Sequence, residues 1–408
     1  MSDLPVVRLA LQTESTGARA ALIRLCAAGF LAYCSYAICR TPLLPLFARQ
    51  LGASAPLVGF VVGASTLTGV LLKLPAGAWS DVLGRRPLLV AGALVFAALP
   101  FGYLAVSTLA TLIVLRFAHG SATAIFGPVA SASLSDVAPV ARRATWLSTY
   151  SAVQGAGQAL GPVLAGYLIA GGRFDLTFIT AGLIALAAPA IVSRWPSPPP
   201  GVRRDDRLSQ FARGVVTIGR DRRILVTSLA QAAQFALNGS LNAFLPLYAR
   251  EVLGLPVAQL GWLFGVQTLA TLAARPLMGS LSDRVGRRSM IVVGLAASSA
   301  AVLFISAAEN VQTLFAAAIA YAAGLAVTTA ATSAHVTDLA HGTRFGAAHG
   351  IFGTIYDVGD ALGPITAGLL VAGVGYARMF QIMAGAAMAM AAVFAISSRQ
   401  PAAEAQPA

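Results

Sequence analysis

The chain has little charge for its length. Only 11% of its 408 residues are Asp, Glu, Lys or Arg, whereas an ordinary soluble domain has about 25%. A soluble fold could not cover its surface with so few charged side chains, so a soluble globular enzyme is excluded as the main interpretation. A disordered chain is excluded as well, because 57% of the residues are apolar and disorder requires low hydrophobicity.

Lysine and cysteine are also scarce. The one lysine, Lys73, follows Leu72, whereas a phosphate-binding P-loop needs Gly-Lys-Ser/Thr, so ATP hydrolysis by that route is excluded. The three cysteines all lie in the first apolar run and indicate no disulfide framework. No nucleophile–base set emerges, and we expect neither an enzyme nor a cofactor. Spacing alone does not make a closed metal site, so we expect no metal ion at a group of residues whose spacing resembles that of metal ligands. These residues are His335, Asp338, His341 and His349.

Apolar runs of membrane-spanning length are abundant. A transmembrane helix needs about 20 apolar residues, and backbone groups in lipid must be paired within the chain, so such runs are helices. The sequence therefore predicts an all-α membrane protein with twelve transmembrane helices. The spans are expected at 24–47, 57–78, 87–107, 109–132, 145–170, 174–193, 224–248, 257–280, 289–308, 311–334, 345–372 and 376–397.

The net charge of +13 is distributed as in a multi-pass membrane protein, and not as in a nucleic-acid binder. Short basic clusters separate the apolar runs, and cytoplasmic loops are enriched in Lys and Arg. With the N-terminus inside, the inner segments hold 20 of the 28 basic residues, and the outer loops hold Arg49, Arg173, Arg250 and Arg378. We expect a protein of the cytoplasmic (inner) membrane with both termini in the cytoplasm.

The two halves of the sequence repeat at an offset of 202 residues. The stretch 77–86 matches 279–288, and this offset holds over most of six spans. The repeat predicts two pseudo-symmetric six-helix bundles with a central pathway between them. The segment between the bundles opens with prolines and is rich in arginine. Two interpretations fit this composition, namely a solvated linker and a short helix on the inner membrane surface. The expected divisions are an N-terminal cytoplasmic segment at 1–20, bundles at 21–193 and 224–397, the linker at 194–223 and a cytoplasmic tail at 398–408.

Three stretches resemble motifs of the major facilitator superfamily. The Gly-x-x-x-Asp-x-x-Gly-Arg-Arg stretch after the second span resembles its signature loop, and it recurs after the eighth span. Arg116-Phe-Ala-His119-Gly120 resembles the fourth-helix motif, whose arginine is implicated in proton coupling and which usually has glutamine at the place of His119. The resemblance covers about residues 20–397 and is greatest to the twelve-helix drug/proton antiporters. Their fifth-helix antiporter motif is matched by Gly157, Gly161, Pro162 and Gly166.

The signature loop places a carboxylate and two arginines at the inner end of a helix in each half. Charge pairs at bistable interfaces are a recurrent switching device, so we predict a conformational latch. The alternative is that the arginines serve only to orient the chain in the membrane. The latch residues are Gly77, Asp81, Gly84, Arg85, Arg86, Gly279, Asp283, Gly286, Arg287 and Arg288.

Among the ionisable residues inside apolar spans, we take three that have no ionisable counterpart in the other repeat as unusual: Arg116, Asp357 and Asp360. Such residues are costly in a membrane and are functional by default. The aspartates are three apart and share a helix face, and their apolar setting opposes ionisation. We predict that all three residues take part in proton coupling. Binding of a cationic substrate or a structural ion pair is the alternative for the aspartates, and a brace to a carbonyl is the alternative for Arg116.

The resemblance implies that spans one, four, seven and ten line the pathway. A mostly apolar cavity with few polar groups suits amphipathic ligands. We predict a secondary active transporter, working as a monomer, that exports small amphipathic compounds by alternating access against inward proton flow. Uptake or facilitated diffusion of a small metabolite is the first alternative, and a non-transporting membrane sensor is the second. The substrate-binding candidates are Arg40, His119, Gln231, Gln234, Phe235, Asn238 and Asn242.

Overall fold

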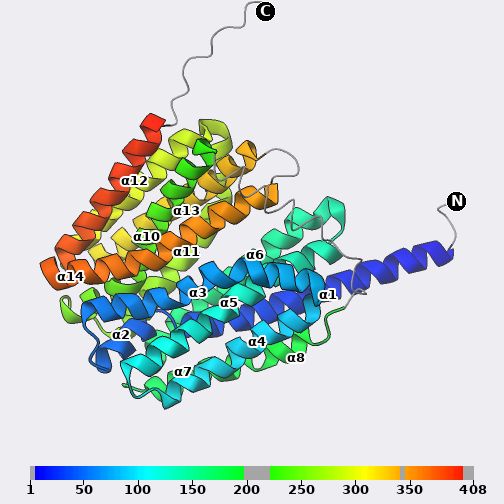
Figure 1. Cartoon of the computed structure of the whole chain (residues 1–408), viewed down its shortest axis with the longest axis horizontal. Coiled ribbons are helices and arrows are strands. Elements are labelled where there is room, and N and C mark those ends of the chain that lie inside the picture. The colour runs from blue at the N-terminus through cyan, green and yellow to red at the C-terminus, as the bar shows by residue number, and fades with distance from the viewer. Residues whose placement is uncertain (1–4, 197–220, 341–344, 398–408) are drawn as a thin grey trace, which may run out of the picture. The chain divides into compact units, whose positions relative to one another are not determined.

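The computed structural model describes residues 5–196, 221–340 and 345–397. These ranges are helical apart from short turns, and no β-strand occurs within them (Figure 1). The helices are α1 (Pro5–Ile38), α2 (Leu43–Gln50), α3 (Ala55–Val82), α4 (Arg85–Gly102), η1 (Tyr103–Ala105), α5 (Leu109–Val137), η2 (Val140–Arg142), α6 (Arg143–Ile169), α7 (Phe174–Ala185), α8 (Ala187–Val192), α10 (Arg222–Glu251), α11 (Val257–Val285), α12 (Arg287–Ser306), α13 (Val311–Leu339) and α14 (Phe345–Ser397).

The predicted all-α fold is confirmed, and most residues of each of the twelve predicted spans are helical. Over the described ranges, nine helices are long and apolar enough to cross a membrane. One of them, α14, contains two predicted spans. Gly375 interrupts it with φ 77°, a conformation that glycine adopts without steric cost. α6 and α10 are not among the nine.

The first predicted span, 24–47, is divided in the structure. α1 is already helical from Pro5 and ends at Ile38, and α2 begins at Leu43 after a turn that contains Pro42. A proline has no N–H to donate and clashes with the preceding helical turn, so the helix stops there. Most of the predicted linker at 194–223, like the tail at 398–408, lies outside the described residues.

The chain forms two compact units. Unit 1 comprises Met1–Ser54, Phe60–Arg204 and Pro246–Leu269. Unit 2 comprises Ala55–Gly59, Asp205–Leu245 and Ala270–Ala408. Most of each unit comes from one sequence repeat, with a short segment from the other. The expected bundle boundaries at 21–193 and 224–397 remain predictions.

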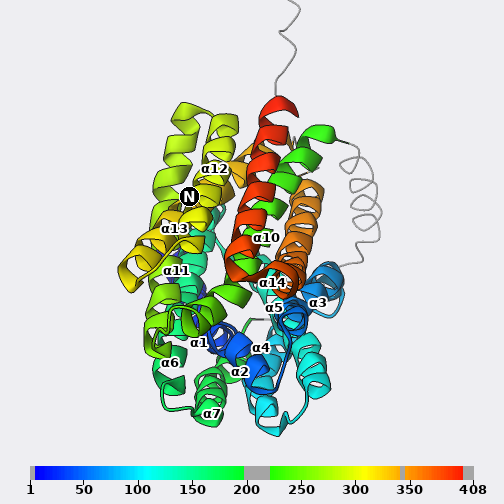
Figure 2. The same cartoon turned by 90° about the vertical axis from the view of Figure 1, so that its left-hand side faces the viewer.

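Each unit has an apolar core of its own. In unit 1, the rings of Tyr33, Phe96 and Phe126 pack against one another, with centroid separations from 5.4 to 6.5 Å. In unit 2, α12 and α13 lie side by side (Figures 1 and 2), and Leu295 and Phe394 belong to the cluster that they form with α10 and α14.

Candidate functional site

Arg116 of α5 is fully buried in unit 1. Its Nε donates to the carbonyl oxygen of Val61 at 3.3 Å. Its two amino groups donate to the Tyr103 hydroxyl at 3.2 Å and to Ser65 Oγ at 2.5 Å. These acceptors are all neutral, and the bond to Val61 is the brace to a carbonyl that was the alternative role for Arg116. A buried cation without an opposite charge is costly in free energy.

Three rings surround this arginine. The Tyr36 ring centroid lies 6.0 Å from the guanidinium carbon, in cation–π range. Its hydroxyl donates to Ser65 Oγ at 3.2 Å. His119 packs edge-on against Tyr36 with centroids 5.0 Å apart, and its Nδ1 lies 3.1 Å from the Tyr103 hydroxyl. The sequence identified the arginine and His119, but it missed the tyrosines and the serine, because no fixed spacing links residues on separate helices.

Arg116→Met is expected to abolish proton-driven transport while leaving the apparent melting temperature in detergent unchanged or raised. The physical reason is that an apolar side chain of similar length removes the desolvation cost of an uncompensated cation. Thermal unfolding of the purified variant and its transport rate in proteoliposomes are the two measurements. A clear fall in melting temperature with transport retained would assign Arg116 to the brace alone.

The two aspartates are both enclosed in α14. Asp357 is 6% exposed and Asp360 is 7% exposed. They belong to unit 2, whereas Arg116 belongs to unit 1. On α13, the Tyr321 hydroxyl accepts a hydrogen bond from Gln234 Nε2 at 3.3 Å. This bond joins a substrate-binding candidate in unit 2 to a tyrosine that the sequence analysis missed.

The candidates of the seventh span follow one face of α10. Gln231 is buried, and its side-chain oxygen accepts a hydrogen bond from the Thr332 hydroxyl at 2.6 Å. This bond, like the one from Gln234, ties α10 to α13. The ring of Phe235 packs on Tyr356 of α14 with centroids 4.8 Å apart. The less enclosed candidates, all half-buried, are Arg40, Phe235, Asn238 and Asn242.

The first signature loop forms an ion-pair network in unit 1. Arg85 pairs with Asp81 at 2.8 Å, and its Nε lies 2.9 Å from Oδ2 of Asp136 at the end of α5. Gly84 precedes the arginine with φ 92°, and this left-handed turn favours glycine. The network ties the start of α4 to the ends of α3 and α5.

The second signature loop repeats this network in unit 2. Arg287 pairs with Asp283 and with Asp338, whose Oδ2 lies 3.1 Å from Arg287 Nε. The predicted carboxylate–arginine pairs are therefore present in both repeats. The sequence analysis left Asp136 and Asp338 out of the latch, although their match in the repeat was a usable signal. Of the other latch residues, Gly77 and Gly279 have open space around them, Arg86 is exposed and Arg288 is half-buried.

Gly157 and Gly161 of the antiporter-like motif lie where α6 approaches α1 in unit 1, whereas Gly166 lies against Gly261 of α11. A Cβ at Gly157 would lie 2.5 Å from the carbonyl oxygen of Phe30, and a Cβ at Gly161 would lie 2.6 Å from Ala37 Cβ. Small residues of this kind let membrane helices approach closely. The matching glycines of α14 approach α10 in the same way, so close packing accounts for the pattern in both repeats: Gly359 and Gly363.

The histidines with metal-like spacing do not form a cluster within the described part of the chain. No group of three metal-ligating side chains is present there. Asp338 pairs with Arg287, and His349 Nε2 lies 3.0 Å from the Thr337 hydroxyl. His341 lies outside the described residues.

The sequence repeat, with an ion-pair network in each half, is found in a known superfamily of membrane proteins. The family model of the Major Facilitator Superfamily matches residues 25–258 and 227–408. The chain belongs to this superfamily of transporters, and it is a multi-pass membrane protein. Transporters of this superfamily are not enzymes.

The relatives agree with this assignment. The chain is 24% identical over 356 residues to an uncharacterized MFS-type transporter of Methanocaldococcus jannaschii, covering 84% of this chain and 89% of the relative. It is 24% identical over 333 residues to multidrug resistance protein MdtH of Salmonella newport, covering 81% of each.

Two solved structures share the fold. The nucleoside transporter NupG matches with a TM-score of 0.79 at 14% identity. The match covers 93% of this chain and 100% of that one. An inward-facing bacterial homolog of the human lysosomal transporter Spinster has a TM-score of 0.74 at 16% identity, covering 93% and 95%. At these identities the likeness concerns the fold alone.

Proposed function

We propose that this transporter exports small amphipathic compounds by alternating access in exchange for protons. The observation that carries the proposal is the enclosed pair Asp357 and Asp360 in the apolar helix α14. A carboxylate removed from water resists ionisation, so its proton affinity changes when water reaches it. Such a group can take up a proton on one side of the membrane and release it on the other.

Other features support the export of amphipathic compounds. Relatives named multidrug resistance protein are similar over most of the chain. The α10 face combines amide side chains with the ring of Phe235, and few polar groups in an apolar setting suit amphipathic ligands. In this proposal the seven substrate-binding candidates contact the ligand, and the networks around Arg85 and Arg287 act as the latch. The protein works as a monomer in the inner membrane, with both termini in the cytoplasm.

The test uses purified protein in weakly buffered detergent and in proteoliposomes. Lipophilic cations, neutral drugs and small metabolites are added in turn, and proton release is recorded. We expect release with at least one amphipathic compound, and transport of that compound that accelerates with an imposed pH gradient. Binding without proton release, together with a transport rate that ignores the gradient, would replace exchange by facilitated diffusion.

A further inference from the structure

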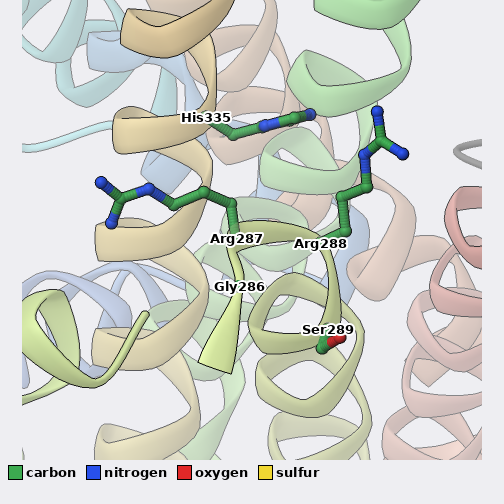
Figure 3. Close-up of a pocket in the computed structure, with 5 residues that line it drawn as sticks. All are labelled: Gly286, Arg287, Arg288, Ser289 and His335. Atoms are coloured by element: carbon green, nitrogen blue, oxygen red, sulfur yellow. The ribbon is translucent and has the colours of Figure 1, made fainter. Parts of the chain in front are cut away.

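Arginine side chains lie among polar groups in both units, but their charges are not balanced alike. An open pocket of about 370 Å³ lies at the start of α12 in unit 2 (Figure 3). Its lining residues are Gly286, Arg287, Arg288, Ser289 and His335. Arg287 already pairs there with Asp283 and Asp338. Arg116 in unit 1 has no such carboxylate among the residues that the structure describes, so a negatively charged ligand group would gain more at Arg116.

The charge of Arg116 is enclosed among neutral groups. Its side chain is fully buried, and its hydrogen bonds go to the Val61 carbonyl oxygen, the Tyr103 hydroxyl and Ser65 Oγ. The nearest ring is that of Tyr36. A buried cation without a counter-charge is costly, and such a residue within a membrane helix is functional by default. An anion bound beside the guanidinium would remove this cost.

His119 provides an independent indication of a ligand. Its side chain is fully buried, and its Nε2 has no hydrogen-bond partner in the described part of the chain. Buried polar atoms are rarely left in this state. His119 follows Arg116 by three residues on α5, so both lie on one face of the helix. Both also lie against the Tyr36 ring, whose centroid is 5.0 Å from that of His119 and 6.0 Å from the guanidinium carbon.

The Tyr103 hydroxyl determines which nitrogen of His119 carries the proton. It accepts a hydrogen bond from Arg116 at 3.2 Å, so its own proton is available to His119 Nδ1 at 3.1 Å. With Nδ1 as the acceptor, Nε2 carries the N–H of the neutral imidazole. The opposite tautomer would leave both the Tyr103 proton and Nε2 unpaired. The first arrangement is therefore favoured, and His119 presents an N–H donor that lacks an acceptor.

Tyr103 is held from outside α5. It belongs to η1, and its ring stacks on Phe178 of α7 with centroids 4.6 Å apart and 6° between the planes. Its hydroxyl therefore reaches Arg116 and His119 from a ring that neither of them positions. Removal of this hydroxyl alone would leave the stacking intact.

We propose that this cluster recognises the carboxylate group of an amphipathic substrate. Arg116 supplies the opposite charge, His119 supplies an N–H donor, and Tyr103 is the positioning residue for both. A carboxylate is an acceptor with two oxygens, and it pairs well with a guanidinium. The inference rests on the alternating access proposed above, because the cluster is closed in this structure and the carboxylate enters in another state of the cycle. It names the class of substrate, which proton exchange leaves open.

The test compares two fluorescent probes that share one apolar body, anthracenecarboxylate and anthracenemethylammonium. Their binding to the purified full-length protein in detergent is followed by fluorescence. Tyr103→Phe removes the hydroxyl and keeps the ring that stacks on Phe178. Tyr167→Phe is the matched control, because it removes another hydroxyl of unit 1, which accepts a hydrogen bond from Trp262 Nε1 at 2.8 Å.

We expect the wild type and Tyr167→Phe to bind the carboxylate at least about tenfold more tightly than the ammonium, because the cluster offers a cation and a donor. Tyr103→Phe should bind the carboxylate about tenfold more weakly and the ammonium unchanged. In a His119→Gln background the same substitution should cost less, because an amide always has N–H donors. A tyrosine with a merely structural role would weaken both probes in both backgrounds.

Equal affinity of the wild type for the two probes, absence of carboxylate binding, or unchanged carboxylate binding by Tyr103→Phe would overturn the proposal. Melting temperatures show whether the variants are folded. If Tyr103→Phe is not, His119→Phe decides, because it keeps a ring against Tyr36 and removes the donor; unchanged carboxylate affinity there would also overturn the proposal. Proton release by another compound would leave proton exchange standing, whereas carboxylate binding without proton release would contradict the exchange alone.

Discussion

Asp360→Asn is expected to abolish ligand-induced proton release and to make transport insensitive to an imposed pH gradient. An amide preserves the size and most of the hydrogen bonding of the carboxylate, but it cannot exchange a proton. Asp360 is enclosed in α14. Its carbonyl oxygen would lie 2.6 Å from a Cβ at Gly239 of α10, so a change of charge on Asp360 is suited to affect that helix. Proton release in weak buffer and counterflow in proteoliposomes measure the effect.

Two comparison variants make this result interpretable. Asp175→Asn removes an exposed carboxylate from the first turn of α7, and it should leave proton release unchanged. Asp357→Asn tests whether the neighbouring carboxylate shares the proton. If Asp360→Asn no longer transports cationic ligands but still exchanges neutral ligands for protons, Asp360 is assigned to cation binding. Full retention of gradient-driven transport in Asp360→Asn and Asp357→Asn would reduce the pair to a structural role.

Gly161→Leu is expected to prevent α1 and α6 from packing and to give little folded protein. Even a single Cβ would lie 2.6 Å from Ala37 Cβ and 2.8 Å from the carbonyl oxygen of Cys34, so a leucine cannot fit without separating the two helices. Overpacking costs roughly 3 kcal/mol at the upper end of its usual range, and here backbone atoms must move. The yield of monodisperse protein and its apparent melting temperature are the measurements.

Gly385→Leu is the matched control for this change. Gly385 lies in α14 and is exposed. A Cβ added there would have no heavy atom of a neighbouring residue within 4 Å. The same added volume should therefore have little effect there. Gly363→Leu should be as damaging as Gly161→Leu, because Gly363 makes the equivalent approach to Ala236 in unit 2. A folded and stable Gly161→Leu protein would show that the α1–α6 contact is looser than the structure describes.

Much of the fold could be predicted because the membrane limits the choice. Only helices satisfy the backbone in lipid, so apolar runs became helices at the expected places. The repeat then indicated two related bundles, and the network around Arg85 recurs around Arg287 as the 202-residue offset implies. The break at Pro42 and the start of α1 at Pro5 were not predicted. A hydropathy pattern reports which residues are apolar, and not where a polar helix continues beyond the membrane.

The sequence by itself determined the membrane class, the spans, the repeat and the unusual ionisable residues Arg116, Asp357 and Asp360. Only the tertiary structure decided what surrounds them. It placed Tyr36 and Tyr103 around Arg116, brought Gly239 against Asp360, and joined Ser289 and His335 in one pocket. The physical reason is that polarity and periodicity act along one helix, whereas these neighbours come from different helices. Their proximity depends on how side chains of several helices pack together, and no spacing in the sequence records it.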